Sequence, residues 1–202
     1  MRKTNRKSIV LYFILGLFAI SIIVYSIYSI ASNDNKEAPQ RLEIQPSYAV
    51  NISDPVELIG ICHQVFTGTV VKKTYSFSDV YRGNQNWELP YQLYEVNVHQ
   101  MIKGDLNETI TVMQQGGEID GKIWLMDGDE FLEEGCTYLF ATRYDEETDS
   151  YTLVPNYGDV KIDTLTRSSD IVAQYQQAYK ASTDYDAAHG MDDPRGNRIA
   201  TE

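Results

Sequence analysis

The sequence has 202 residues, of which 43% are hydrophobic, so it can build one hydrophobic core of ordinary size rather than two large domains. Its formal net charge of −12 argues against partners that are themselves anionic. Nucleic acids and anionic lipid headgroups belong to that class, because like charges repel. We therefore expect no nucleic-acid partner.

The chain begins with a basic tail and a long apolar run. Residues 1–7 carry four positive charges, and the uncharged run over 8–31 is rich in Ile, Leu, Val, Phe and Tyr. From Ile9 to Ile30 it would be about 33 Å long as a helix, enough for a hydrocarbon core about 30 Å thick. We predict a cytoplasmic tail and a single transmembrane anchor, with the remaining chain outside. A signal peptide cleaved after Ala31 is the alternative, although its apolar region usually has only about 7–15 residues.

A polar linker separates this anchor from the folded domain. Residues 32–47 contain two prolines and few apolar side chains, which predicts a flexible stalk without fixed structure before about Tyr48. Beyond the anchor there are 13 Lys and Arg against 29 Asp and Glu, a net charge near −16. This charge keeps an exported domain soluble and would suit cationic partners.

Short runs of alternating apolar residues between Tyr48 and Ile162 are typical of antiparallel β-structure. The runs are HQVFTGTVV, YEVNVH, ETITVMQ, YLFATRY and YTLV. The last two flank DEETDS, which predicts a hairpin with an acidic tip. Lys103-Gly104-Asp105 predicts a turn before the third run, and Gly116-Gly117 predicts its end.

The pattern changes to a helical period near the C-terminus. In SSDIVAQYQQAYKAS, four apolar residues share one helical face, so we predict a helix over 169–182: Ile171, Val172, Tyr175 and Tyr179. Residues 183–202 are polar and rich in turn formers, which predicts a disordered tail. About six short strands and one late helix favour a small antiparallel barrel over a sandwich, with the domain spanning 48–182.

The order of these segments resembles a known family. HQVFTGTVV, YQLYEVNVHQMIKGDLNETITVMQQGG, GDEFLEEGCTYLFATRY and YTLVPNYG follow the strand order of netrin-like, tissue-inhibitor-of-metalloproteinases-like OB-fold domains. The resemblance covers roughly residues 57–162. It implies a five-stranded Greek-key barrel with an attached helix, a fold usually used for binding. The zinc-chelating N-terminal cysteine of the family's inhibitors is not matched, because about sixty residues precede Cys62.

The two cysteines allow two different interpretations. Cys62 and Cys136 both lie in the exported part, where oxidising conditions permit a disulfide. Such a bridge would close a loop of roughly 75 residues and would stabilise the fold by about 4 kcal/mol in the chain-entropy model. We expect this bridge to tie the first strand of the barrel to a late one.

A catalytic cysteine is the alternative interpretation. Sortase-like transpeptidases are membrane-anchored β-barrel enzymes that use His, Cys and Arg in that chain order, and His63, Cys136 and Arg143 follow it here. However, Cys136 follows Glu-Glu-Gly and opens a strand, whereas the sortase cysteine closes one. Its spacing to the arginine is also shorter than is usual in that family. The alternative requires a free thiol.

Other candidate sites are weaker. Tyr75, Tyr81 and Trp87 lie in or beside the long link between the first two β-runs, which borders the binding face in OB-folds, so we predict ligand contacts there. The three histidines lack metal-ligand spacing, and the acidic clusters near Asp127 and Asp145 lack the spacing of an EF-hand loop. No metal and no cofactor are therefore expected.

Together these patterns predict a single-pass, extracytoplasmic OB-like binding module of a Gram-positive-type cell envelope, without catalytic activity. Its expected partner is an envelope protein or polymer. A cysteine transpeptidase or hydrolase is the first alternative, and inhibition of an extracellular protease by a mode other than an N-terminal cysteine is the second. Fold resemblance alone does not decide among them.

Overall fold

The structure is a computed structural model, and it describes residues 15–26, 39–80, 88–106, 108–162 and 165–191. The chain divides into two compact units, Met1–Pro39 and Gln40–Glu202. In the first unit, residues 15–26 form a helix with exposed side chains. Among the described residues no helix has both the length and the apolar character to span a membrane. The basic tail and the remainder of the predicted anchor lie outside the described residues.

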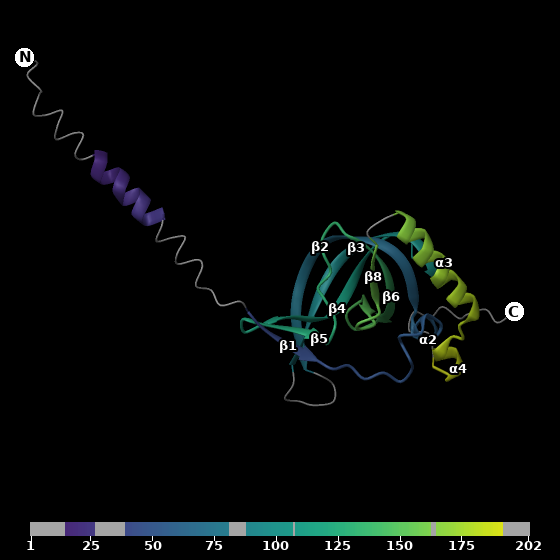
Figure 1. The fold of residues 1–202 in the computed structure, drawn as a ribbon. Helices are drawn as coiled ribbons and strands as arrows, with labels where there is room; N and C mark the ends of the chain where they lie inside the picture. The colour runs from purple at the N-terminus through teal and green to yellow at the C-terminus, as the bar shows by residue number, and fades with distance from the viewer. Residues whose placement is uncertain (1–14, 27–38, 81–87, 107, 163–164, 192–202) are drawn as a thin grey trace, which may run out of the picture. The chain divides into compact units, whose positions relative to one another are not determined.

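The second unit is mainly β, with one short helix between its first two strands and two helices after its last strand (Figure 1). Its elements in chain order are β1 (Gln40–Ile44), α2 (Pro55–Ile61), β2 (Gln64–Val80), β3 (Glu88–Lys103), β4 (Thr109–Ile119), β5 (Lys122–Met126), β6 (Thr137–Asp145), β7 (Ser150–Leu153), β8 (Asp159–Ile162), α3 (Leu165–Ala181) and α4 (Tyr185–Ala188).

Five strands pair in a closed circuit. β2 pairs antiparallel with β3 and with β6, β3 pairs antiparallel with β4, and β6 pairs antiparallel with β7. β7 then returns to β4 through a short parallel pairing, in which Val112 lies opposite Tyr151. β5 and β1 extend the sheet from β4, and β8 pairs with β6 beside β7.

β6 and the first half of β2 are buried on both faces. Phe66 and Phe140 point to one side, where their rings stack 5.1 Å apart in a cluster with Tyr94 and Val96. Their chain neighbours Val65, Leu139 and Ala141 point to the other side and pack against α2 and α3. The near-continuous apolar run in VFTGTVV and YLFA follows from this double burial. Thus β2 and β6 separate two hydrophobic clusters.

The glycine pair in β4 bends the strand instead of ending it, so the predicted end of this strand at Gly116-Gly117 was wrong. β4 continues to Ile119 and pairs there with β5. Gly116 has φ +135°, and an added Cβ would lie 2.7 Å from Leu125 Cδ2 and 2.9 Å from Trp124 O. Only glycine lets the two backbones approach so closely where β4 leaves β3 for β5.

Several predicted elements are confirmed. β6 and β7 form the expected hairpin around the acidic tip, and the turn at Lys103-Gly104-Asp105 places Gly104 at φ +88°. The late helix exists but begins at Leu165, four residues earlier than predicted. Its residues Val172 and Tyr175 are buried against the sheet, whereas Tyr179 is exposed. Ala178 takes the buried position in the last turns.

The predicted stalk and tail are partly ordered, which corrects both boundaries. Within the expected stalk, β1 pairs in parallel with β5, because Leu42 and Ile44 alternate with polar residues and half-bury against it. Tyr48 then donates a hydrogen bond to Pro155 O at 2.9 Å. Within the expected tail, α4 forms with Asp184 as its N-cap. The domain therefore extends from Gln40 to at least Met191.

α2 was missed by the sequence reasoning. Asp54 is its N-cap and accepts a hydrogen bond from Val56 N at 2.8 Å, and Pro55 occupies the first turn. This Asp-Pro pair is a recognised helix start, because proline lacks the N–H that the first turn leaves unpaired. The helix buries Leu58 and Ile59 and ends at Cys62, just before β2.

Candidate functional site

β2 extends beyond its pairing with β6, while residues 91–97 of β3 also pair with β4. β6 accompanies β2 only as far as Thr69, opposite Thr137, and two further backbone bonds join Val70 to Gly135 and Cys136. β2 and β3 remain paired to their ends at Val80 and Glu88. In the described part of the chain, residues 71–80 of β2 therefore pair as a strand with β3 alone, and we call this part the β2–β3 arm.

A row of aromatic rings lies along the β2–β3 arm. Phe77 stacks on Tyr91 at 5.2 Å between ring centroids and on Tyr75 at 6.3 Å. Tyr75 is 64% exposed, and Val71, earlier on the same strand, is 47% exposed. Phe77 and Tyr91 are half-buried, so Tyr75 is the exposed ring of the three and the part of the row that a partner could contact.

Buried hydrogen bonds hold the base of this aromatic row in place. Gln92 is fully buried, and its amide nitrogen donates to Tyr75 O and Leu93 O, each at 3.0 Å. Ser76 donates its hydroxyl to the Gln92 side-chain oxygen. Because these bonds fix the backbone beneath Tyr75, its ring is presented from a rigid element. Of the three predicted ligand contacts, Tyr75 lies on this surface, and Tyr81 and Trp87 lie outside the described residues.

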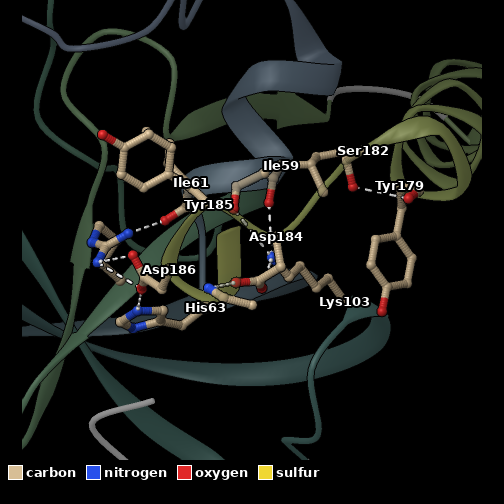
Figure 2. A network of polar contacts seen from close by, with 12 residues as sticks. Ile59, Ile61, His63, Lys103, Tyr179, Ser182, Asp184, Tyr185 and Asp186 are labelled. Carbon is tan, nitrogen blue, oxygen red and sulfur yellow. Dashed lines mark hydrogen bonds and ion pairs between the residues drawn. The ribbon is translucent and has the colours of Figure 1, made fainter. Parts of the chain in front are cut away.

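A second polar arrangement joins α2, the strands and α4 (Figure 2). Asp186 of α4 accepts from His63 Nε2 at 2.8 Å and from Arg143 NH2 at 2.9 Å. Asp184 accepts from Lys103 Nζ at 3.0 Å. Arg143 NH1 also donates to Ile61 O at the end of α2. We call the three basic side chains His63, Lys103 and Arg143 the basic cradle.

The protonation of His63 follows from its neighbours. The Tyr144 amide donates to Nδ1 at 2.9 Å, so Nδ1 carries a lone pair and no proton. Nε2 then carries the hydrogen that is donated to Asp186. The ring is a neutral imidazole fixed between a backbone amide and a carboxylate.

Lys103 is a deeply buried member of the basic cradle. Its side chain is 10% exposed, and its ammonium donates to Ile59 O and Asp184 at 3.0 Å. The carbonyls at the end of α2 and the carboxylate together offset the cost of removing this charge from water. Burial opposes ionisation of Asp184, but bonds from the Ala187 amide and from Lys103 outweigh it and lower the pKa of Asp184.

The structure does not bring the sortase-like residues together. His63 and Arg143 share Asp186 at one end of β6, whereas Cys136 precedes the other end. Seven residues of extended chain from Cys136 to Arg143 span about 23 Å. A nucleophile must lie within hydrogen-bond reach of its base, so these three residues do not form one catalytic group.

The register of the β2–β6 pairing contradicts the predicted disulfide between Cys62 and Cys136. Cys62 and Cys136 are free, the first buried with α2 and α3 and the second half-buried against the other cluster. They flank opposite ends of the β2–β6 ladder, whose five steps from Thr69 to Gln64 alone span about 17 Å. A disulfide needs Cα atoms within about 7 Å. Burial raises the pKa of Cys62 to about 12, which makes it an inert core thiol.

Two carboxyl groups outside the predicted sites are strongly perturbed. Burial, together with the neighbouring charge of Asp129, raises the pKa of Asp159 to about 7. Burial also raises the pKa of Asp129 to about 6, although the Asn156 amide, which donates to it at 2.7 Å, acts in the opposite direction. Asp129 belongs to the acidic loop considered for calcium. Among the described residues no three His, Cys, Asp or Glu side chains converge as metal ligands.

Sequence reasoning missed the basic cradle, because its members are separated by up to 123 positions from the aspartates they bind. The one local signal was the Asp184-x-Asp186 spacing, in a segment predicted to be disordered. The sequence matches no protein-family profile and no curated protein. The geometry of the described residues is thus the basis for any functional assignment.

Proposed function

We propose that this chain is a membrane-anchored, extracytoplasmic binding module of the cell envelope, built on an OB-like Greek-key barrel, and that it changes no covalent bond in its partner. The closed circuit β2-β3-β4-β7-β6, with its single parallel pairing between β4 and β7, supports the barrel. The basic, then apolar N-terminus supports the anchor, with residues 1–7 in the cytoplasm. No cofactor is part of the proposal.

The aromatic row on the β2–β3 arm, with Tyr75 as its exposed ring, carries this proposal. Three stacked rings offer apolar area at low cost in side-chain entropy, and the buried Gln92 bonds preorganise them. Their partner is an envelope protein or polymer that covers Tyr75. In an OB-like barrel, this hairpin borders the face used for binding, which agrees with the site predicted from the sequence.

The absence of catalysis in this proposal is supported by the separation of Cys136 from His63 and Arg143. The imidazole of His63 and the guanidinium of Arg143 are both engaged by Asp186 and by backbone groups of Tyr144 and Ile61. Neither ring nitrogen of His63 is available to activate a nucleophile in this arrangement.

A binding experiment with matched tyrosine variants tests the proposal. The full chain in mild detergent is titrated against isolated envelopes of its source cell, alongside Tyr75→Ser and the control Tyr179→Ser. Both tyrosines are exposed, 64% and 42%, but Tyr179 lies on α3 away from the β2–β3 arm. We expect Tyr75→Ser to weaken binding at least tenfold, about 1.4 kcal/mol, and Tyr179→Ser to leave it unchanged. Equal binding by all three proteins, or covalent change of the envelope material by mass spectrometry, would refute it.

A further inference from the structure

The basic cradle is unusual for so acidic a protein. The part of the chain beyond residue 31 has 13 Lys and Arg against 29 Asp and Glu. Nevertheless Lys103, Arg143 and His63 come together from three separate strand ends, and their polar atoms meet two aspartates of one short segment. Such convergence of donors is the arrangement proteins use to recognise carboxylates.

The two aspartates divide the cradle between them. Asp184 binds the Lys103 ammonium, which also contacts the last carbonyls of α2. Asp186, 10% exposed in its side chain, receives both the His63 imidazole and the Arg143 guanidinium. Figure 2 shows His63 directed at Asp186 and Lys103 directed at Asp184. The recognition unit is therefore two carboxylates separated by one residue.

Charge, rather than apolar packing, holds this segment. α4 has four residues, and Asp186 is its buried member. The backbone of the segment comes close to α2 at Gly60, where an added Cβ would lie 2.8 Å from Thr183 O. The apolar anchor of this region is α3, whose Val172, Tyr175 and Ala178 pack in the core before the segment begins. These ion pairs are largely buried, with side-chain exposures of about 10% for His63, Lys103 and Asp186 and of 30% and 38% for Asp184 and Arg143. A competitor can therefore displace the segment only if it presents carboxylates in place of Asp184 and Asp186, because a buried charge left without its partner is costly.

We propose that the basic cradle is a binding site for acidic peptide segments of the form Asp-x-Asp, and that residues 184–186 occupy it as a built-in, displaceable ligand. A ligand of this site must present two carboxylates, one that binds Lys103 and one that binds both His63 and Arg143. This site is separate from the β2–β3 arm, and its contacts do not depend on what the arm binds.

Two variants open the site without removing its basic groups. Asp184→Asn with Asp186→Asn removes the two charges of the built-in ligand. Gly60→Ala instead pushes Thr183 away by contact and keeps every charge. The probe is a fluorescein-labelled synthetic peptide with the sequence of residues 181–191, ASTDYDAAHGM, and its binding to the full chain is followed by fluorescence anisotropy.

We expect the opened variants to bind the probe at least tenfold more tightly than the unmodified chain, because the tethered segment competes at high effective concentration. Raising the salt from about 50 mM to about 500 mM should weaken this binding. A probe with Asn in place of both Asp should not bind. In the opened chain, Arg143→Gln should abolish binding, whereas Lys180→Gln, a change of an exposed lysine on α3, should not.

The proposal is wrong if the folded opened variants bind the probe no better than the unmodified chain, because the contact is then a fixed part of the fold. It is equally wrong if both opened variants fail to fold by circular dichroism, because the segment would then be indispensable to the domain. Binding that survives Arg143→Gln in the opened chain would show that the probe uses another surface.

Discussion

At the scale of single residues, the two perturbed carboxyl groups make stability depend on pH. The folded-state pKa of Asp159, about 7, is well above its ordinary value of 3.8. Between these values the folded protein binds more protons than the unfolded chain, so the free energy of unfolding falls as pH rises through this window. Asp129, with a pKa of about 6, acts in the same direction.

Replacement of Asp159 by asparagine should reduce this dependence and leave the part that Asp129 contributes. We expect Asp159→Asn to raise the free energy of unfolding at pH 8 by about 1–2 kcal/mol and to leave it nearly unchanged at pH 4. Urea unfolding of the full chain at pH 4, 5, 6, 7 and 8 measures the free energy of unfolding and its slope with pH for the variant and for the unmodified chain. Glu118→Gln, a change of an exposed strand carboxylate, serves as control and should keep the slope of the unmodified chain. An unaltered slope in Asp159→Asn would contradict the expectation.

A second residue-scale prediction concerns Gln64. Its side chain is fully buried, and within the described chain neither its amide nitrogen nor its oxygen has a hydrogen-bond partner. Burying an unpaired amide costs about 1–3 kcal/mol, whereas an apolar side chain of similar shape avoids that cost. We expect Gln64→Met to stabilise the domain by about 1 kcal/mol in urea unfolding. Destabilisation would mean that the Gln64 amide is hydrogen bonded in solution.

Residue-scale features were the hardest to foresee from the sequence. Tyr75 was expected in a link between two β-runs, but it lies within β2, which continues to Val80, and its side chain is exposed. Asp186 and Asp159 carried no local signal. Their environments depend on Arg143, on Asp129 and on burial by segments far away in the chain, which no local pattern encodes.

At the scale of elements, the bend in β4 offers a test of backbone geometry. At Gly116, φ is +135° and an added Cβ would collide with Leu125 and Trp124. Gly121, in the following turn, also has positive φ, +71°, but nothing lies within 4 Å of an added Cβ. We expect Gly116→Ala to cost about 3 kcal/mol or more and Gly121→Ala about 1 kcal/mol. Thermal unfolding of both variants measures the difference, and equal losses would show that steric contact at the bend contributes nothing.

Element boundaries show which sequence signals were reliable. The hairpin of β6 and β7 was predicted because strict alternation flanks an acidic turn, and this signal is local. Gly116-Gly117 was interpreted as the end of a strand, since glycine pairs usually interrupt strands. Here the two glycines lie within β4, where its pairing changes from β3 to β5. β1 was hidden in a polar segment because its pairing partner lies about eighty positions later.

At the scale of the whole molecule, the strands β2 and β6 hold two hydrophobic clusters on their opposite faces, and each cluster contains or contacts one cysteine. Cys62 is 1% exposed beside α2 and α3, and Cys136 is half-buried near the start of β6. The two thiols therefore report on different parts of the fold. Because the β2–β6 register keeps Cys62 and Cys136 too far apart for a disulfide, a reductant should leave the folded protein unchanged.

Thiol labelling of the full chain under native conditions should consequently proceed in two phases. We expect Cys136 to react with a maleimide within minutes, and Cys62 to react only at the rate of opening of the α2–α3 side of the core, at least a hundredfold more slowly. After denaturation, intact mass should show two labels per chain whether or not a reductant is present. Val172→Ala, which leaves a cavity beside Cys62, should accelerate the slow phase alone, because it destabilises one cluster by about 1–3 kcal/mol and spares the other. A single label-free species that gains two hydrogens on reduction would instead require β2 and β6 to pair in a different register.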